Sequence, residues 1–195
     1  MKERLILIGG GGHCKACIDV IEQESRYEIA GILDKAERVG QIILGYPIVG
    51  TDNDIKTYMQ KGHHFLITIG QIHSPQSRIK LFSALKMLHA PLATVISPRA
   101  YVSQHATIGD GTIIMHDALI NTDAQIGENC IINTKALIEH DVRIKENCHI
   151  STGALINGGT IVRSGTFFGS GAISKEYTQT LNNAFIKAGT VYKGL

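Results

Sequence analysis

The chain has 195 residues, of which 19 are basic and 17 are acidic, and its formal net charge is +2. This length permits one large domain or two small ones. The basic residues form no stripe of the kind that neutralises nucleic-acid phosphates, so we expect no nucleic-acid partner. The apolar residues 5–8 are too few to span a bilayer, and Lys2 and Arg4 precede a glycine run, not a signal-peptide core. We therefore expect a cytoplasmic protein without membrane association.

Four cysteines in a chain of this size do not make a disulfide framework, which indicates a reducing compartment. Cys14 and Cys17 form a C-x-x-C motif, as redox and metal half-sites do. However, no second Cys/His pair has zinc-finger spacing, and the motif follows a glycine loop, where a helix should begin. We therefore expect both cysteines to be small residues on the inner face of that helix.

Residues 1–93 alternate predicted strands with predicted helices. In chain order these are a strand at residues 4–8, a helix after residue 12, strands at 27–35 and 63–70, and helices at 54–60 and 77–88. In the first helix, the residues expected to pack on the sheet are Ala16, Ile18, Val20 and Ile21. The alternation predicts a small Rossmann-like α/β domain that binds its ligand at the carboxyl ends of parallel strands.

The glycine run at residues 9–12, followed by His13, is the candidate ligand site of this domain. Glycines let a backbone approach a phosphate, and the next helix points its N-terminus at it. Because Cys14 replaces the third glycine of a dinucleotide fingerprint, a structural tight turn stays open as the alternative. Asp34, at the end of the second strand, is placed to bind a ribose or a base edge, although an ordinary polar turn fits the segment LDK equally well.

A period of six residues runs without a break from Val102 to Phe168. All twelve positions of this register are β-branched aliphatics or Phe, and the position four residues after each is small or β-branched. Three such hexads close one coil of a triangular prism, with parallel strands roughly 4.8 Å apart. Such coils wind left-handed in hexapeptide families, against the usual crossover rule. We therefore predict a left-handed parallel β-helix over residues 94–195, with about four coils.

The register alone makes two further predictions. Cys130 and Cys148 are 18 residues, or one coil, apart and should stack as small apolar fillers. His140 lies two residues beyond an inward position, so its side chain should point outward at a corner, beneath the turn at Gly158 one coil later. A base beside a backbone N–H is the geometry that acyl transfer requires. On this argument alone, a polar surface histidine remains the alternative.

A glycine loop that ends in His, the segments GILDK and ITIG, and a hexapeptide helix that contains INTKALIEHDVRI together resemble the bacterial sugar acyltransferases with hexapeptide repeats. That family includes N-acetyltransferases of UDP-4-amino-4,6-dideoxy sugars and O-acetyltransferases of sialic acid. The resemblance implies an N-terminal nucleotide-sugar domain and a C-terminal domain that uses acetyl-CoA as co-substrate, with no metal. It also implies a homotrimer with active sites between neighbouring prisms.

The resemblance also implies roles for individual residues. As catalytic residues it implies the general base His140, with Glu139 and Asp141 beside it and Asn133 in the same pocket. The residues expected at the coenzyme are His149, Gly158, Gly169 and Gly171, with the Gly158 N–H facing the thioester carbonyl. The residues expected at the sugar nucleotide are Gly11, Gly12, His13, Asp34, Lys35, Gly70 and Gln71.

Members of the family commonly have a further coil with a Leu-Pro-Gly turn, which this sequence lacks. The comparison implies a solenoid one coil shorter and leaves the adenine end of the coenzyme site open. The predicted function is N-acetylation of the 4-amino group of a UDP-linked sugar by direct transfer. One alternative is O-acetylation of sialic acid or another sugar hydroxyl by the same residues. Another is a structural or metal-binding prism of the gamma-carbonic anhydrase type, which needs three converging histidines where His140 and His149 supply two.

Overall fold

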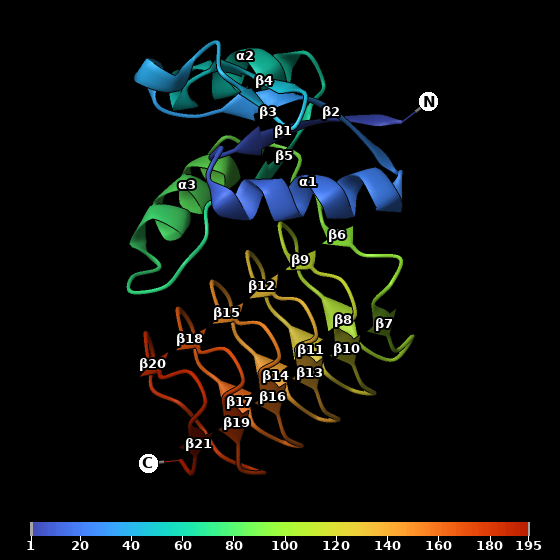
Figure 1. The fold of residues 1–195 in the computed structure, drawn as a ribbon, viewed down its shortest axis with the longest axis vertical. Coiled ribbons are helices and arrows are strands. Elements are labelled where there is room, and N and C mark those ends of the chain that lie inside the picture. The colour runs from blue at the N-terminus through green and yellow to red at the C-terminus, as the bar shows by residue number, and fades with distance from the viewer. Residues whose placement is uncertain (1, 195) are drawn as a thin grey trace.

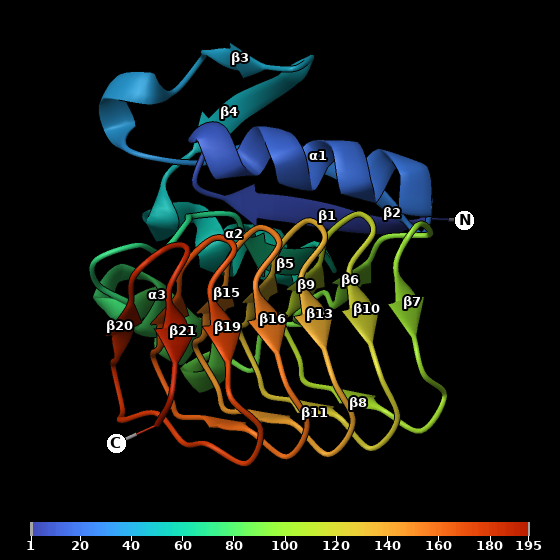
Figure 2. The same ribbon diagram turned by 60° about the horizontal axis from the view of Figure 1, so that its bottom comes forward.

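The computed structural model describes residues 2–194. An N-terminal α/β domain lies against a triangular prism built by the C-terminal half of the chain (Figure 1). This arrangement confirms the predicted fold class. Figure 2 shows the coils of the prism stacked side by side, with the α/β domain along one of its sides.

The N-terminal domain contains one sheet with the strand order β3-β4-β2-β1-β5. Its elements are β1 (Glu3–Ile8), α1 (Gly12–Glu24), β2 (Tyr27–Leu33), β3 (Ile42–Ile43), β4 (Tyr46–Gly50), α2 (Ile55–Gln60), β5 (His64–Ile67) and α3 (Gln76–Met87), with short 3-10 turns at Ala36–Arg38 and Asp52–Asp54. Neighbouring strands are parallel except β3 and β4. The strand order reverses at β1, and the carboxyl end of such a switch point is where open α/β sheets bind ligands.

The three predicted strands and three predicted helices of this domain are present, whereas β3 and β4 were not predicted. Cys14 and Cys17 are buried in α1, which confirms their place on its inner face. Ala16 was expected to pack on the sheet and is exposed instead. Residue 16 lies on the opposite side of the helix from the buried row at 14, 17, 18 and 21, which follows the helical period. None of the helices in residues 2–194 is long and apolar enough to cross a membrane.

The prism is built from two-residue strands that pair with strands one coil away. These strands are β6 (Val95–Ile96), β7 (Tyr101–Val102), β8 (Thr107–Ile108), β9 (Ile113–Ile114), β10 (Leu119–Ile120), β11 (Gln125–Ile126), β12 (Ile131–Ile132), β13 (Leu137–Ile138), β14 (Arg143–Ile144), β15 (His149–Ile150), β16 (Leu155–Ile156), β17 (Ile161–Val162), β18 (Phe167–Phe168), β19 (Ile173–Ser174), β20 (Phe185–Ile186) and β21 (Val191–Tyr192). Partners such as Ile120 and Ile138 are 18 residues apart in parallel register. The predicted coil length is therefore confirmed.

The second residue of each strand points inward and forms the core of the prism. The aliphatic column from Ile114 to Phe168 is buried in a single cluster, together with the small residues of the second column. Cys130 and Cys148 belong to this cluster and are both fully buried, as the register predicted. Their burial makes them packing residues.

The prism is longer than the four coils that the sequence predicted. The additional inward positions are Ile96, Ser174, Thr180, Ile186 and Tyr192. Ser174 and Thr180 are polar yet buried, because their hydroxyl oxygens accept hydrogen bonds from Asn157 N at 2.8 Å and Arg163 N at 2.9 Å. These two residues interrupt the aliphatic pattern in the sequence after Phe168 without interrupting the fold, since paired polar groups can be buried.

The three outer faces of the prism differ in character. The face of β6, β9, β12 and β15 is covered by the N-terminal domain, because Val95, Ile113 and Ile131 share a core cluster with α1. The face of β8, β11 and β14 is polar, with Thr107, Gln125 and Arg143 outward. The third face, which we call the apolar face, carries one outward side chain from each of β7, β10, β13, β16, β19 and β21, namely Tyr101, Leu119, Leu137, Leu155, Ile173 and Val191.

Candidate active site

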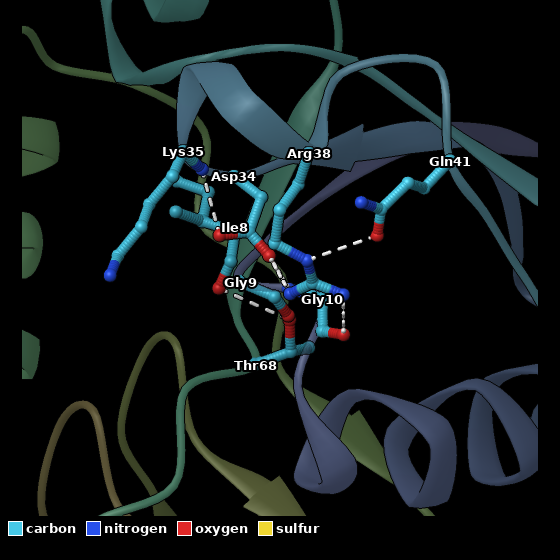
Figure 3. Close-up of polar contacts among 8 residues, drawn as sticks. All are labelled: Ile8, Gly9, Gly10, Asp34, Lys35, Arg38, Gln41 and Thr68. Atoms are coloured by element: carbon cyan, nitrogen blue, oxygen red, sulfur yellow. Dashed lines mark hydrogen bonds and ion pairs between the residues drawn. The ribbon is translucent and has the colours of Figure 1, made fainter.

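Asp34 holds the glycine loop in place at the carboxyl end of β1 (Figure 3). Its Oδ2 accepts a hydrogen bond from Gly10 N at 2.8 Å and pairs with the Arg38 guanidinium. Arg38 also donates to the Gly10 carbonyl at 3.0 Å, and Lys35 N donates to the other carboxylate oxygen at 2.8 Å. Asp34 therefore has a structural task that the sequence did not reveal, and its role at a ribose or base stays a prediction.

Different physical requirements explain why the positions of this loop are glycines. Gly9 has a φ of 101°, and a Cβ there would overlap the Ile69 side chain, so the fold itself requires glycine. At Gly11 and Gly12, by contrast, a Cβ would meet no atom within 4 Å. Gly12 begins α1, whose first turn presents unpaired N–H groups and a positive dipole end. The missing side chains at Gly11 and Gly12 thus leave space where a helix N-terminus can receive an anionic group.

A cavity of about 600 Å³ lies between this loop and the prism. It is lined by Gly9, Gly10, Gly11, Gly12, His13, Asp34, Lys35, Arg38, Thr68, Ile69, Gly70, Gln71, Ile72, Asn133 and His149. All seven residues expected at the sugar nucleotide are among them. A second cavity of about 550 Å³ shares four of these residues, Gly9, Asp34, Lys35 and Ile69, so the two cavities adjoin.

Two histidines, the buried His149 and the half-buried His13, form one wall of the larger cavity. His149 Nδ1 lies 2.6 Å from the Gln71 carbonyl and its Nε2 lies 3.2 Å from Asn133 Nδ2. Burial, with the nearby Arg78 charge, lowers the pKa of His149 to about 4. Burial also lowers the pKa of His13 to about 3, with smaller contributions from Arg78 and His149. Both rings are therefore neutral at pH 7, and His149 carries its proton on Nδ1, which donates to the carbonyl.

The same cavity has polar atoms that the protein leaves unpaired. Within residues 2–194, Gln71 Oε1 and His13 Nε2 are buried and have no hydrogen-bond partner. The Gln71 amide nitrogen donates to the Gly165 carbonyl at 3.1 Å, which fixes the orientation of the amide. The oxygen that remains can only accept. Gln71 therefore offers an acceptor to a ligand hydroxyl or amine.

Arg78, on α3, joins this site to the prism. Its side chain is buried and donates to the Ile67 and Ile69 carbonyls at 3.1 and 2.8 Å. Its other terminal nitrogen donates to the Asn129 carbonyl and to Asn129 Oδ1 at 2.9 and 2.7 Å. Burial lowers the pKa of Arg78 to about 10, so the guanidinium stays charged at neutral pH. The sequence offered no signal for this residue, which looks like any arginine of an exposed helix.

His140 lies at a different corner, between β13 and β14, with its side chain about half exposed. Its Nδ1 is 2.8 Å from Asp141 Oδ2, and this hydrogen bond raises the pKa of His140. The neighbouring Glu139 is oriented otherwise, since its carboxylate accepts from Asn121 Nδ2 at 2.9 Å. Asp141 is therefore the carboxylate that orients the imidazole, and it leaves Nε2 available to accept a proton.

Gly158 lies next to this imidazole, as the register predicted. A Cβ on Gly158 would lie 2.9 Å from His140 Nε2, and Gly159 N donates to the His140 carbonyl at 3.1 Å. Among the described residues, no acceptor receives a hydrogen bond from the Gly158 N–H. The corner thus combines a proton acceptor with a free backbone donor, which is the pairing used to stabilise an oxyanion.

A single chain does not bring all the expected residues together. Asn133 and His149 line the cavity at the glycine loop, and Asn133 lies at one edge of the apolar face. The other edge of this face carries His140, Glu139, Asp141 and Gly158. Gly169 and Gly171 lie at the corner that follows β18, two coils beyond Asn133. Across residues 2–194, no group of three His, Cys, Asp or Glu side chains is arranged to hold a metal ion.

Two family models match the chain. Residues 4–85 match the PglD N-terminal domain, and residues 105–140 and 123–158 match the bacterial transferase hexapeptide of six repeats. Together the matches cover more than half of the chain. The chain belongs to the bacterial sugar acyltransferases with hexapeptide repeats. No curated protein sequence is significantly similar to this family member.

Solved structures of acetyltransferases are similar to this family member along nearly its whole length. The acetyltransferase domain of PglB from Neisseria gonorrhoeae FA1090 is 25% identical, with a TM-score of 0.90 and coverage of 99% of this chain and 92% of that one. The same domain in complex with acetyl coenzyme A is 24% identical, with a TM-score of 0.88 over 100% and 95% of the two chains, and supports the fold. A mutant of perosamine N-acetyltransferase from Caulobacter crescentus, in complex with CoA and GDP-perosamine, is 27% identical, with a TM-score of 0.68 over 96% and 91%.

Proposed function

We propose that this acyltransferase is an N-acetyltransferase that transfers the acetyl group of acetyl-CoA to the 4-amino group of a UDP-linked amino-dideoxy sugar. The observation that carries the choice of acceptor is the pair of adjoining cavities of about 600 and 550 Å³ at the glycine loop. A nucleotide-linked sugar has two bulky parts joined by a pyrophosphate, whereas a free sugar has one. The similar perosamine N-acetyltransferase is solved with a nucleotide-linked amino sugar, which agrees with this choice.

The chemistry of the larger cavity supports the same acceptor. The N-terminus of α1, Lys35 and Arg38 provide positive charge for a pyrophosphate. Gln71 Oε1 is a buried acceptor for a sugar hydroxyl or amine. The four cysteines are free and buried, which agrees with a reducing, cytoplasmic location.

The proposed reaction needs no covalent intermediate on the protein. His140 Nε2 takes a proton from the sugar ammonium, while Asp141 holds Nδ1 and stabilises the imidazolium that forms. The freed amine attacks the thioester carbonyl and forms the C–N bond of a tetrahedral intermediate, whose collapse breaks the C–S bond. The Gly158 N–H stabilises the oxyanion of the tetrahedral intermediate. As the intermediate collapses, the nitrogen loses its second proton to water, and CoA leaves as a thiolate that is protonated by the imidazolium.

A homotrimer would unite the two halves of this site. The apolar face is bordered by the Asn133 corner on one edge and by the His140 corner on the other. When three prisms pack through this face around a three-fold axis, the His140 edge of one copy meets the Asn133 edge of the next. Tyr101 and Val191, at the two ends of the face, are each 59% exposed in a single chain, and an apolar stripe of this length calls for a partner.

Leu137→Lys should dissociate the trimer without unfolding the chain. Leu137 lies mid-way along the apolar face and points outward, so that a lysine there charges the interface and leaves the core intact. We expect the molar mass by sedimentation to fall to that of a monomer, and acetyl transfer to fall at least tenfold. Thr107→Lys, on the polar face, is the matched control and should keep both. A Leu137→Lys protein that stays trimeric would place the interface elsewhere.

The function is tested by incubating the protein with acetyl-CoA and a panel of acceptors while thiol release is followed. The panel contains UDP-linked 4-amino sugars, a GDP-linked 4-amino sugar, their 4-hydroxy analogues and free sialic acid. We expect release with a UDP-linked amino sugar. Release with the hydroxy analogues or with sialic acid alone would instead support the O-acetyltransferase alternative, which uses the same residues.

Gly11→Val should weaken binding of the nucleotide sugar without weakening binding of acetyl-CoA. The protein itself has room for the new side chain, so the fold should persist, while the valine occupies the space in which the pyrophosphate approaches the helix. We expect the Kd for the UDP-sugar to rise at least tenfold in calorimetry. Gly9→Ala is the contrasting variant, because its Cβ would overlap Ile69 at a positive φ and should lower Tm. If Gly11→Val bound the UDP-sugar as the wild type does, the acceptor would not bind at this loop.

A further inference from the structure

Tyr177 occupies a turn position that suits an aromatic residue poorly. From Gly111 onward, the turns of the prism place one residue each in the left-handed region of φ, and at all of them except Lys135 and Tyr177 this residue is Gly, Asp or Asn. Such residues adopt this conformation at little cost, whereas a bulky side chain there is strained. Tyr177 has a φ of 53° and is the one aromatic residue at these turns within residues 2–194. The turn itself does not explain a tyrosine, and strain of this kind is often found at functional sites.

The ring of Tyr177 lies beside the turn formed by Gly158 and Gly159. Tyr177 N donates to the Gly158 carbonyl at 2.9 Å, and a Cβ on Gly159 would overlap the Tyr177 ring. On the other side of the same turn, a Cβ on Gly158 would lie 2.9 Å from the His140 imidazole. The backbone at Gly158 and Gly159 therefore lies between the rings of His140 and Tyr177. Tyr177 is nevertheless 78% exposed, so most of its ring is free to contact a ligand.

Charge along this edge of the prism indicates which way an acyl-CoA lies. On the N-terminal side of Gly158, the turns of the edge carry the carboxylates Asp123, Glu139 and Asp141. On the C-terminal side, the corresponding residues are Lys175, Glu176 and Lys193. The phosphates of CoA are repelled by the first group and attracted by the excess of lysine in the second. With its thioester at Gly158, the coenzyme therefore extends toward the C-terminal coils and passes Tyr177.

We infer that Tyr177 is a binding residue for acyl-CoA, whose ring packs against the pantetheine arm next to the thioester. This inference rests on the proposed function, because it needs the thioester at Gly158. An aromatic ring gives the flexible arm a rigid apolar surface at low entropic cost. The contact holds the thioester against the Gly158 N–H and leaves the acceptor site untouched.

The test uses Tyr177→Asn in the full-length protein, because asparagine suits the left-handed turn. We expect the Kd for CoA, measured by calorimetry, to rise at least tenfold. The KM for the nucleotide sugar should stay unchanged, and Tm should stay equal or rise. Tyr177→Phe keeps the ring and should bind CoA as the wild type does. Acetyl-pantetheine, which lacks the nucleotide, should lose affinity by the same factor as acetyl-CoA.

Leu44→Asn is the matched control, since Leu44 also has a positive φ of 45°, is 57% exposed, and lies on the β3–β4 turn of the other domain. It should leave CoA binding unchanged. A Tyr177→Asn protein that binds CoA normally, or that loses affinity only because the trimer dissociates in sedimentation, would overturn the inference and make Tyr177 a structural or interface residue. A wild-type protein that binds no CoA would instead overturn the proposed function itself.

Discussion

His140→Ala should lower kcat for acetyl transfer by about 100-fold or more, the usual loss when a general base is removed. The expected loss falls on turnover and not on folding, because the His140 side chain points outward and contributes nothing to the aliphatic column of the prism. KM for both substrates should change little. The measurement is steady-state thiol release with a UDP-linked 4-amino sugar, together with Tm and sedimentation of the variant.

Asp141→Asn tests the carboxylate that orients the base while His140 itself stays in place. The rate should fall at low pH in the wild type, because a protonated His140 cannot accept the proton of the substrate. Asp141 raises the pKa of His140 by its hydrogen bond, so the acid limb of the profile should move to lower pH when Asp141 is replaced. Glu139→Gln is the contrasting variant, since the Glu139 carboxylate bonds Asn121 and raises the pKa of His140 only through its charge. Its acid limb should therefore move in the same direction but less than that of Asp141→Asn. If the His140→Ala variant turned over its substrates at nearly the wild-type rate, His140 would not be the general base.

The prism could be predicted from sequence because its side chains obey a strict period. An inward aliphatic every six residues fixes the register, the coil length, and hence the stacking of His140 beside Gly158. The pattern failed at Ser174 and Thr180, where hydrogen bonds between coils replace apolar packing. Such pairing depends on residues one coil away, which a hydropathy pattern does not reveal.

The candidate site was predicted less completely, because its geometry depends on contacts between segments far apart in the chain. The loop residues at 11–13 and 70–71 were expected at one ligand, and they do line one cavity. No sequence signal indicated the ion pair between Arg38 and Asp34 or the hydrogen bonds from Arg78 to Asn129. An arginine that pairs with backbone carbonyls obeys no spacing rule. Asn133 and His140 are separated because they lie at different corners of the prism. The six-residue period does not say which corner each turn occupies until the three faces have been identified.

Arg78→Met should destabilise the protein more than any surface substitution, by about 3–5 kcal/mol. The guanidinium is buried and donates four hydrogen bonds, to the Ile67 and Ile69 carbonyls on one side and to Asn129 on the other. Methionine fills similar space yet donates none of them, so buried acceptors of both domains lose their partner. For a chain of this size the loss corresponds to a fall in Tm of roughly 6–20 °C.

Arg99→Met is the matched control for Arg78→Met. Arg99 pairs with Asp117 at 2.9 Å, but its side chain is 57% exposed, and such surface pairs contribute at most about 1 kcal/mol. Because the Ile69 carbonyl precedes Gly70 and Gln71, the Arg78 variant should also bind the nucleotide sugar more weakly at temperatures where it is still folded. An Arg78→Met protein that melts with the wild type would show that the packing of α1 on the prism, and not this arginine, holds the two domains together.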